Sequence, residues 1–201
     1  MLAVTSVQAG TLFEAARSGD LEQARRLIDA GASVDARRAG DGLTALHVAA
    51  AFGRAQLAEL LLANGASVNA SSDNGLTPLH LAAAKGGTAL VALLVARGAD
   101  VDAKDRTGAS ALHAAAAKGH TAVVELLITG GADINARARD RITALHLAAA
   151  AGHKATVELL IKRGAKLNVK TKRNRFTPLA VARLEGHADV AALLRKHGAK
   201  E

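Results

Sequence analysis

A nine-residue segment, Gly-Leu-Thr-Pro-Leu-His-Leu-Ala-Ala at positions 75–83, recurs along almost the whole chain. Its Thr77 has counterparts at Thr44, Ser110, Thr143 and Thr177, so successive copies lie 33, 33, 33 and 34 residues apart. A fixed period of this length indicates an array of structural repeats, in which each unit buries apolar surface only against its neighbours. The 201 residues are therefore predicted to contain one continuous domain of stacked units.

Each unit is predicted to contain two short helices joined by a tight turn. In the first full copy, one helix covers residues 44–51 and Gly53 ends it. A second helix begins at Arg54 or Ala55, and its leucines at positions 57, 60 and 61 follow the i, i+3, i+4 spacing of one helical face. Neither helix reaches the roughly 12–15 residues that an isolated helix needs in water. Neighbouring units must therefore stabilise each helix.

The remainder of each unit is predicted to be a loop. Gly65 ends the second helix in the left-handed conformation, which a residue without Cβ adopts at no steric cost. A short extended piece over residues 66–69 then leads into a hairpin-like polar loop with Gly75 at its tip. The fold class expected is an all-α solenoid of helix-turn-helix-hairpin-loop units.

The first and last units depart from the pattern. Glu14 stands where later units carry Val or Leu, and Ala180 replaces the histidine of the motif. Polar substitution is expected in terminal units, because one side of each faces water. The predicted boundaries are a flexible tail over residues 1–10 and a single domain over 11–201, with a cap at 11–36, repeats at 37–69, 70–102, 103–135 and 136–168, and a cap at 169–201.

Composition excludes several kinds of protein. The chain has no cysteine, which excludes disulfides and thiolate metal sites. No apolar run approaches the roughly 18–20 residues of a membrane helix. Residues 1–9 are mildly apolar but lack a basic start and are short for a signal peptide. We expect a cytoplasmic protein, with export by a removed signal peptide as the alternative.

The repeated residues closely resemble the ankyrin repeat over about residues 11–200. The similarity consists of Thr-Pro-Leu-His-Leu-Ala-Ala, then Gly-His, then Val-Val-Glu-Leu-Leu at 123–127 and Gly-Ala-Asp-Ile-Asn-Ala at 131–136. The resemblance implies that the motif histidine ties neighbouring turns together by hydrogen bonds. It also implies a scaffold that binds a partner protein through a concave face of first helices and loop tips.

The histidines of the motif, at positions 47, 80, 113 and 146, do not indicate catalysis or metal binding. Adjacent repeats lie on the order of 10 Å apart, one helix-packing distance, whereas zinc–nitrogen bonds are about 2 Å. The chain also lacks His-Glu-x-x-His, a phosphate loop ending in Lys-Ser or Lys-Thr, and Gly-x-Ser-x-Gly. We therefore predict that the protein is not an enzyme and holds no metal or cofactor.

Positive charge is concentrated in two loops of the C-terminal half. Residues 136–175 contain 11 basic and 2 acidic side chains. In these loops Arg141 and Arg175 replace the tip glycine found in earlier copies. Because a non-glycine residue is penalised at positive φ, both tips are expected to turn differently, with Asp140 and Asn174 absorbing the change.

The predicted partner-binding residues flank the motif in each copy. Two of them, Phe52 and Phe176, are aromatic residues of the kind that anchor interfaces, although Phe176 can equally cover the end of the core. The full set is Leu43, Phe52, Leu76, Lys85, Arg106, Lys118, Arg139, Arg141, Ile142, Arg173, Arg175 and Phe176.

Three functional hypotheses follow. The first is a monomeric, non-catalytic scaffold that binds another protein with an acidic patch. The second is binding of nucleic acid or another anion through the basic loops, for which affinity falls steeply with salt. The third is an engineered or reconstructed scaffold without a cellular partner, which the strict spacing and absent cysteine favour and the uneven charge disfavours.

Overall fold

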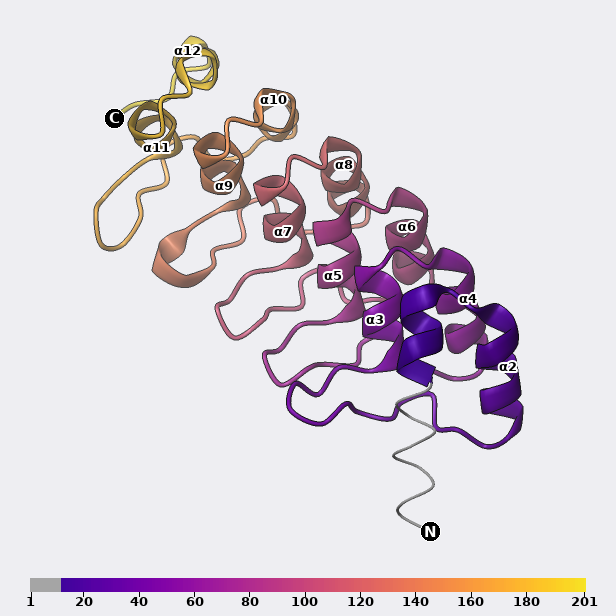
Figure 1. The fold of residues 1–201 in the computed structure, drawn as a ribbon. Coiled ribbons are helices and arrows are strands. Elements are labelled where there is room, and N and C mark those ends of the chain that lie inside the picture. The colour runs from indigo at the N-terminus through magenta and orange to yellow at the C-terminus, as the bar shows by residue number, and fades with distance from the viewer. Residues whose placement is uncertain (1–11) are drawn as a thin grey trace. The chain divides into compact units, whose positions relative to one another are not determined.

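The computed structural model describes residues 12–201, and the tail predicted for residues 1–10 lies outside them. The chain forms two compact units, one ending at Asp100 and one running from Val101 to Glu201. Within each unit the helices lie in pairs, and the long loops extend beside the first helix of each pair (Figure 1). The single domain over residues 11–201 and the boundaries of its repeats stay predictions.

The N-terminal unit is built from short helices that stack in two layers. Residues 12–18 are helical. The helices that follow are α2 (Leu21–Asp29), α3 (Ala45–Ala51), α4 (Ala55–Ala63), α5 (Pro78–Lys85) and α6 (Thr88–Ala96). First helices pack on first helices, α3 on α5, and second helices on second helices, α2 on α4 and α4 on α6. The predicted helix-turn-helix pattern is confirmed.

The C-terminal unit has the same arrangement. Its helices are α7 (Ala111–Ala117), α8 (Thr121–Thr129), the short turn η1 (Arg139–Arg141), α9 (Ala144–Ala150), α10 (Lys154–Lys162), α11 (Pro178–Leu184) and α12 (Ala188–Lys196). Helices α7, α9 and α11 form one layer, and α8, α10 and α12 form the other. Residues 12–201 contain no strand, so the all-α prediction is confirmed for the part that the structure describes.

Leucine and alanine fill the core between the two layers. The motif leucine of each first helix is at most 1% exposed, and the corresponding leucine of each second helix is fully buried: Leu46, Leu79, Leu112, Leu145 and Leu179, then Leu61, Leu94, Leu127, Leu160 and Leu194. Buried alanines such as Ala49 and Ala148 separate them. Small side chains let the paired helices approach closely, which compensates for a core almost without aromatic residues.

A hydroxyl residue and a histidine close the start of most first helices. The backbone N–H of Thr44 donates to Nδ1 of His47 at 3.1 Å, and the Thr44 hydroxyl lies 2.9 Å from the same nitrogen. Equivalent contacts occur at Thr77, Ser110 and Thr143. Because the backbone N–H can only donate, Nδ1 must carry the lone pair, and the ring proton is therefore on Nε2.

That Nε2–H group donates to the loop of the next repeat. The acceptors are the carbonyl oxygens of Leu76 for His47 at 2.9 Å, Ile142 for His113 at 3.2 Å and Phe176 for His146 at 3.2 Å. The linking role that the ankyrin resemblance implies is thus confirmed for these three histidines. Burial lowers the pKa of each below the ordinary 6.5, because a charged ring would lose its hydration.

A second set of links joins successive loops at the far end of each repeat. The side-chain oxygen of an Asp or Asn accepts from a backbone N–H about one repeat later: Asp35 from Ser67, Asn69 from Asp100, Asp102 from Asp133, Asn135 from Lys166 and Asn168 from Lys200. These acceptors lie where extended pieces were predicted. That prediction is wrong for residues 68–69, which form a turn.

Candidate partner-binding surfaces

The N-terminal unit has an amphipathic cleft of about 370 Å³ formed by the helix of residues 12–18, the loop between α2 and α3, and α3. The lining residues are Phe13, Glu14, Arg17, Arg38, Leu43, Val48, Ala51 and Phe52. Two predicted site residues, Leu43 and Phe52, meet in it. Phe52 is the C-cap residue of α3, and its side chain is 44% exposed. An aromatic ring exposed at a cleft is a common interface anchor.

Two guanidinium groups lie over the aromatic rings of this cleft. The Arg17 guanidinium carbon is 5.7 Å from the centroid of Phe52, and that of Arg38 is 6.0 Å from the centroid of Phe13. These distances fit cation–π contacts. Arg38 also forms an ion pair with Asp41 and holds the pKa of that carboxyl below its ordinary value. The cleft therefore combines apolar side chains with two guanidinium groups and the Glu14 carboxylate.

The other predicted residues of this unit, Leu76 and Lys85, do not line the cleft. Leu76 is half-buried, and its carbonyl oxygen is occupied by His47. Lys85 is exposed at the end of α5, and its side chain passes 3.8 Å from where a Cβ on Gly53 would stand. The stem of Lys85 therefore lies next to the residue that follows Phe52.

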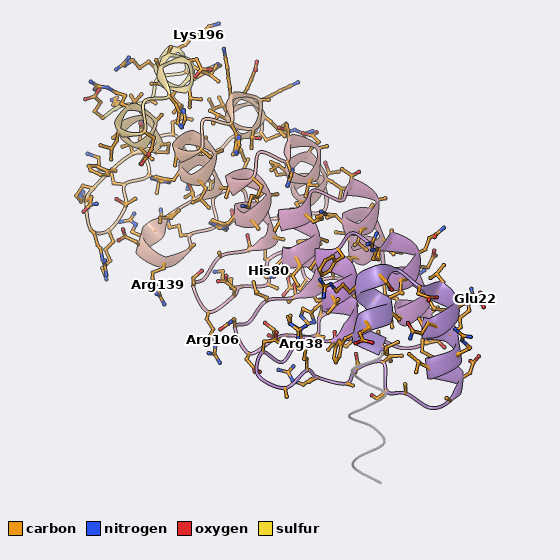
Figure 2. The ribbon with its side chains drawn as sticks, in the orientation of Figure 1. Glu22, Arg38, His80, Arg106, Arg139 and Lys196 are labelled. Carbon is orange, nitrogen blue, oxygen red and sulfur yellow. The ribbon has the colours of Figure 1, made fainter. Side chains whose placement is uncertain are left out.

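Figure 2 shows Arg106 and Arg139 of the C-terminal unit projecting from the tips of their loops, away from the helices. Arg139 lines a cleft of about 630 Å³ with Asp140, Ile142, Lys172 and Arg173. Three predicted site residues, Arg139, Ile142 and Arg173, thus lie together.

The predicted arginines Arg141 and Arg175 line a different cleft, of about 580 Å³. Its lining shares no residue with the cleft around Ile142 and consists of Arg137, Arg141, Lys166, Leu167, Asn168, Val169, Lys170 and Arg175. We call it the basic cleft. Arg137, Lys166 and Lys170 were not predicted, although they belong to the run of positive charge in residues 136–175.

The tip that ends at Arg141 turns differently from its earlier copies, as expected, because residues 139–141 form the short turn η1 and residues 106–108 do not. The expectation that Asn174 absorbs the change at the other tip is wrong. Arg141 and Arg175 themselves adopt φ values of 63° and 58°, close to the 76° of Gly108 at the equivalent tip. Asp140 also has a positive φ of 61°, but Asn174 does not share the left-handed conformation. The closing hydrogen bonds at the base of these loops persist, with Ala138 donating to Ile142 and Thr171 to Phe176. Closure therefore imposes a positive φ on the residue at the tip position, whether it is glycine or arginine.

The last predicted residues stand apart from these clefts. Arg106 and Lys118 are exposed and line neither cleft of the C-terminal unit described above. Phe176 is half-buried, and its backbone accepts from His146 and closes its own loop.

Residues 12–201 contain no group of three or more His, Cys, Asp or Glu side chains that could hold a metal ion. Within the same range, every helix is too short or too polar to cross a bilayer.

A family model described as ankyrin repeats in three copies matches the chain at residues 12–105, 68–138 and 112–201. The overlapping matches cover all of the described residues. They agree with the paired helices, the linking histidines and the loops that join successive pairs. Ankyrin repeats are generally protein–protein interaction modules and typically non-enzymatic. This chain belongs to the ankyrin repeat family.

Proposed function

We propose that the chain is a non-catalytic binding module whose N-terminal cleft accepts an apolar side chain of a partner protein. The exposed ring of Phe52 carries this proposal. Among the described residues, Phe52 and Leu184 are the large hydrophobic side chains left exposed, at 44% and 68%. Of the two, Phe52 lines a cleft with other apolar side chains, Phe13, Leu43 and Val48. Such a cleft buries a partner's side chain on several sides.

Charge at the rim defines the partner further. Arg17 lies over the Phe52 ring and has no ion-pair partner within residues 12–201. Its guanidinium is therefore available to a carboxylate, whereas Arg38 is already paired with Asp41. The partner segment that fits carries an apolar anchor next to one or more acidic residues. The Ile142 cleft, with Arg139 and Arg173 beside an apolar side chain, offers the same combination in the C-terminal unit.

The test is selection of a random peptide library on the full chain, followed by affinity measurements with single selected peptides. We expect enriched peptides to combine a large apolar residue with neighbouring Asp or Glu. Phe52→Ala should weaken their binding roughly 30-fold, the effect of losing an interface anchor worth about 2 kcal/mol.

Leu184→Ala is the matched control, because Leu184 is also large and exposed but lies in the other unit. It should leave binding unchanged. Circular dichroism should show that both variants remain folded. Equal affinities of wild type and Phe52→Ala for every selected peptide would rule out this cleft as the binding site.

A further inference from the structure

We propose that the basic cleft of the C-terminal unit binds a ligand carrying two or more phosphate groups. This site goes beyond the protein binding proposed above, since its lining shares no residue with either the Phe52 cleft or the Ile142 cleft. In this proposal Arg141 and Arg175 bind phosphate, whereas the other predicted site residues bind the partner protein.

The positive charge of the basic cleft is not neutralised by neighbouring side chains. Five of the eight lining residues are cationic, and none is acidic: Arg137, Arg141, Lys166, Lys170 and Arg175. None of the five forms an ion pair within residues 12–201. Elsewhere in the same unit, by contrast, Arg163 pairs with Glu125 and Arg183 with Glu201. Cations gathered around a cavity without counter-charge repel one another, and a bound anion relieves that repulsion.

The walls of the basic cleft are held in place before any ligand arrives. Asp140 joins the two loops that form it, because its carbonyl oxygen accepts from the Lys172 N–H at 2.9 Å and its carboxylate from the Arg173 N–H at 2.8 Å. Arg141 and Arg175 project from tips whose left-handed conformation is imposed by loop closure. Because the backbone of both loops is already ordered, the cost of ordering on binding falls on the cationic side chains alone.

The cationic surface continues into an adjoining cavity of about 400 Å³. Arg137 and Lys166 line both cavities, and Lys104 adds a further cation. Asp133 adds one negative charge to the second cavity, against the three cations Lys104, Arg137 and Lys166. Two neighbouring cationic cavities with shared walls fit a ligand with more than one anionic group.

Charge density favours phosphate over carboxylate. A phosphate monoester carries about −1.5 to −2 charges near neutral pH, so two or three such groups match five cations. Three of the five cations are arginines, whose planar forks bind phosphate oxygens in pairs. No aromatic side chain lines either cavity, which disfavours stacking of nucleic-acid bases.

The experiment is calorimetric titration of the full chain with inorganic tripolyphosphate. Two double variants are compared with wild type: Arg137→Gln with Arg175→Gln in the basic cleft, and Arg139→Gln with Arg173→Gln in the Ile142 cleft. Each pair removes two charges from the same two loops, so net charge is matched. We expect the first pair to weaken binding at least about tenfold and the second to change it less than about threefold. Equal weakening by both pairs, or no binding by wild type, would overturn the proposal.

Two further arms identify the ligand. Vesicles containing a bisphosphorylated inositol lipid distinguish a lipid headgroup from a soluble phosphate. If the vesicles retain the wild-type protein but not the first double variant, the ligand is a lipid headgroup. If the wild-type protein binds tripolyphosphate but the vesicles do not retain it, the ligand is a soluble phosphate. A glutamate-rich peptide or random duplex DNA that binds as tightly as tripolyphosphate at equal salt would overturn the assignment to a compact phosphate ligand.

Discussion

The Nε2 atom of His146 lies 3.2 Å from the carbonyl oxygen of Phe176, thirty residues further along the chain. The same ring accepts the Thr143 N–H through Nδ1. One neutral imidazole therefore caps its own helix and fixes the loop of the next repeat. Protonation would place a hydrogen on Nδ1, facing the Thr143 N–H, so the charged ring cannot keep both contacts.

Acid should therefore destabilise the protein below about pH 6.5, the ordinary pKa of histidine. Burial lowers the pKa of His47, His113 and His146 in the folded state, so the unfolded chain binds protons first as the pH falls. Their contribution is complete above pH 6.5 and is lost as the pH falls toward the folded pKa. Each histidine contributes roughly 1.4 kcal/mol per pH unit in that window. Urea unfolding at pH 7.5 and 5.5 measures the loss.

His146→Ala separates this effect from other acid titrations. At pH 7.5 it should cost about 1–3 kcal/mol, because the Thr143 N–H and the Phe176 carbonyl lose a partner. It should then lose less stability on acidification than wild type. His197→Ala, at an exposed position, should stay within about 0.5 kcal/mol of wild type at pH 7.5. An unchanged acid loss in His146→Ala would contradict the assigned neutral state.

Leu145→Ala should lower the free energy of unfolding by about 2–5 kcal/mol, as expected for a buried large-to-small change. Leu145 is 1% exposed in α9. Leu184→Ala makes the same chemical change at a side chain that is 68% exposed, and it should cost less than about 0.5 kcal/mol. Denaturant titration of both variants measures the difference. Similar costs at the two sites would show that Leu145 does not face the core.

Arg141→Gly should stabilise the protein by about 0.5–1 kcal/mol. The left-handed conformation costs a residue with a Cβ roughly 1–2 kcal/mol, and the greater freedom of glycine in the unfolded chain offsets part of the gain. Gly108→Ala is the reciprocal control at the equivalent tip, where a Cβ finds its nearest neighbour at 3.5 Å and meets no clash. It should destabilise by about 1 kcal/mol. Thermal unfolding of both variants tests the opposite signs, and a destabilised Arg141→Gly would mean that the arginine side chain stabilises its loop.

Asp20→Ala should cost about 1 kcal/mol, because Asp20 caps α2 by accepting from the Gln23 N–H at 2.9 Å. Asp29→Ala removes the same charge from the last residue of that helix, where a carboxylate opposes the helix dipole. It should leave stability unchanged or slightly higher. Loss of helical circular dichroism on heating compares the two, and equal stabilities of the two variants would show that the Asp20 cap contributes nothing to α2.

The helices, their caps and their inward faces could be predicted because each depends on residues close in sequence. The spacing of Leu57, Leu60 and Leu61 indicates a helical face without knowledge of what packs on it, and Asp20 acts on a helix that begins one residue later. The arginine tips could not be predicted in this way. Local preference disfavours φ > 0 at Arg141, but hydrogen bonds across the base of the loop impose it.

The candidate site was only partly predictable for a similar reason. Phe52 stands out as an isolated aromatic residue, but its cation–π contact comes from Arg17, thirty-five residues earlier. Arg139 and Arg141 are two positions apart, yet they line different cavities. Which side of a loop tip a side chain faces depends on the closure of the loop and on the adjacent loop. The repeat period of the sequence gives no information about loop closure or about the adjacent loop.

The Asp and Asn links between successive loops have a consequence for how such a chain can grow. In the C-terminal unit, Asn135 bonds the Lys166 N–H and Asn168 bonds the Lys200 N–H, so each link reaches only the next repeat. A duplicate of residues 136–168 inserted after Asn168 would supply an N–H donor for Asn168 of the preceding copy and an Asn acceptor for the N–H of the following one. Gene duplication can therefore lengthen this protein by one whole repeat without leaving any of these bonds unmade.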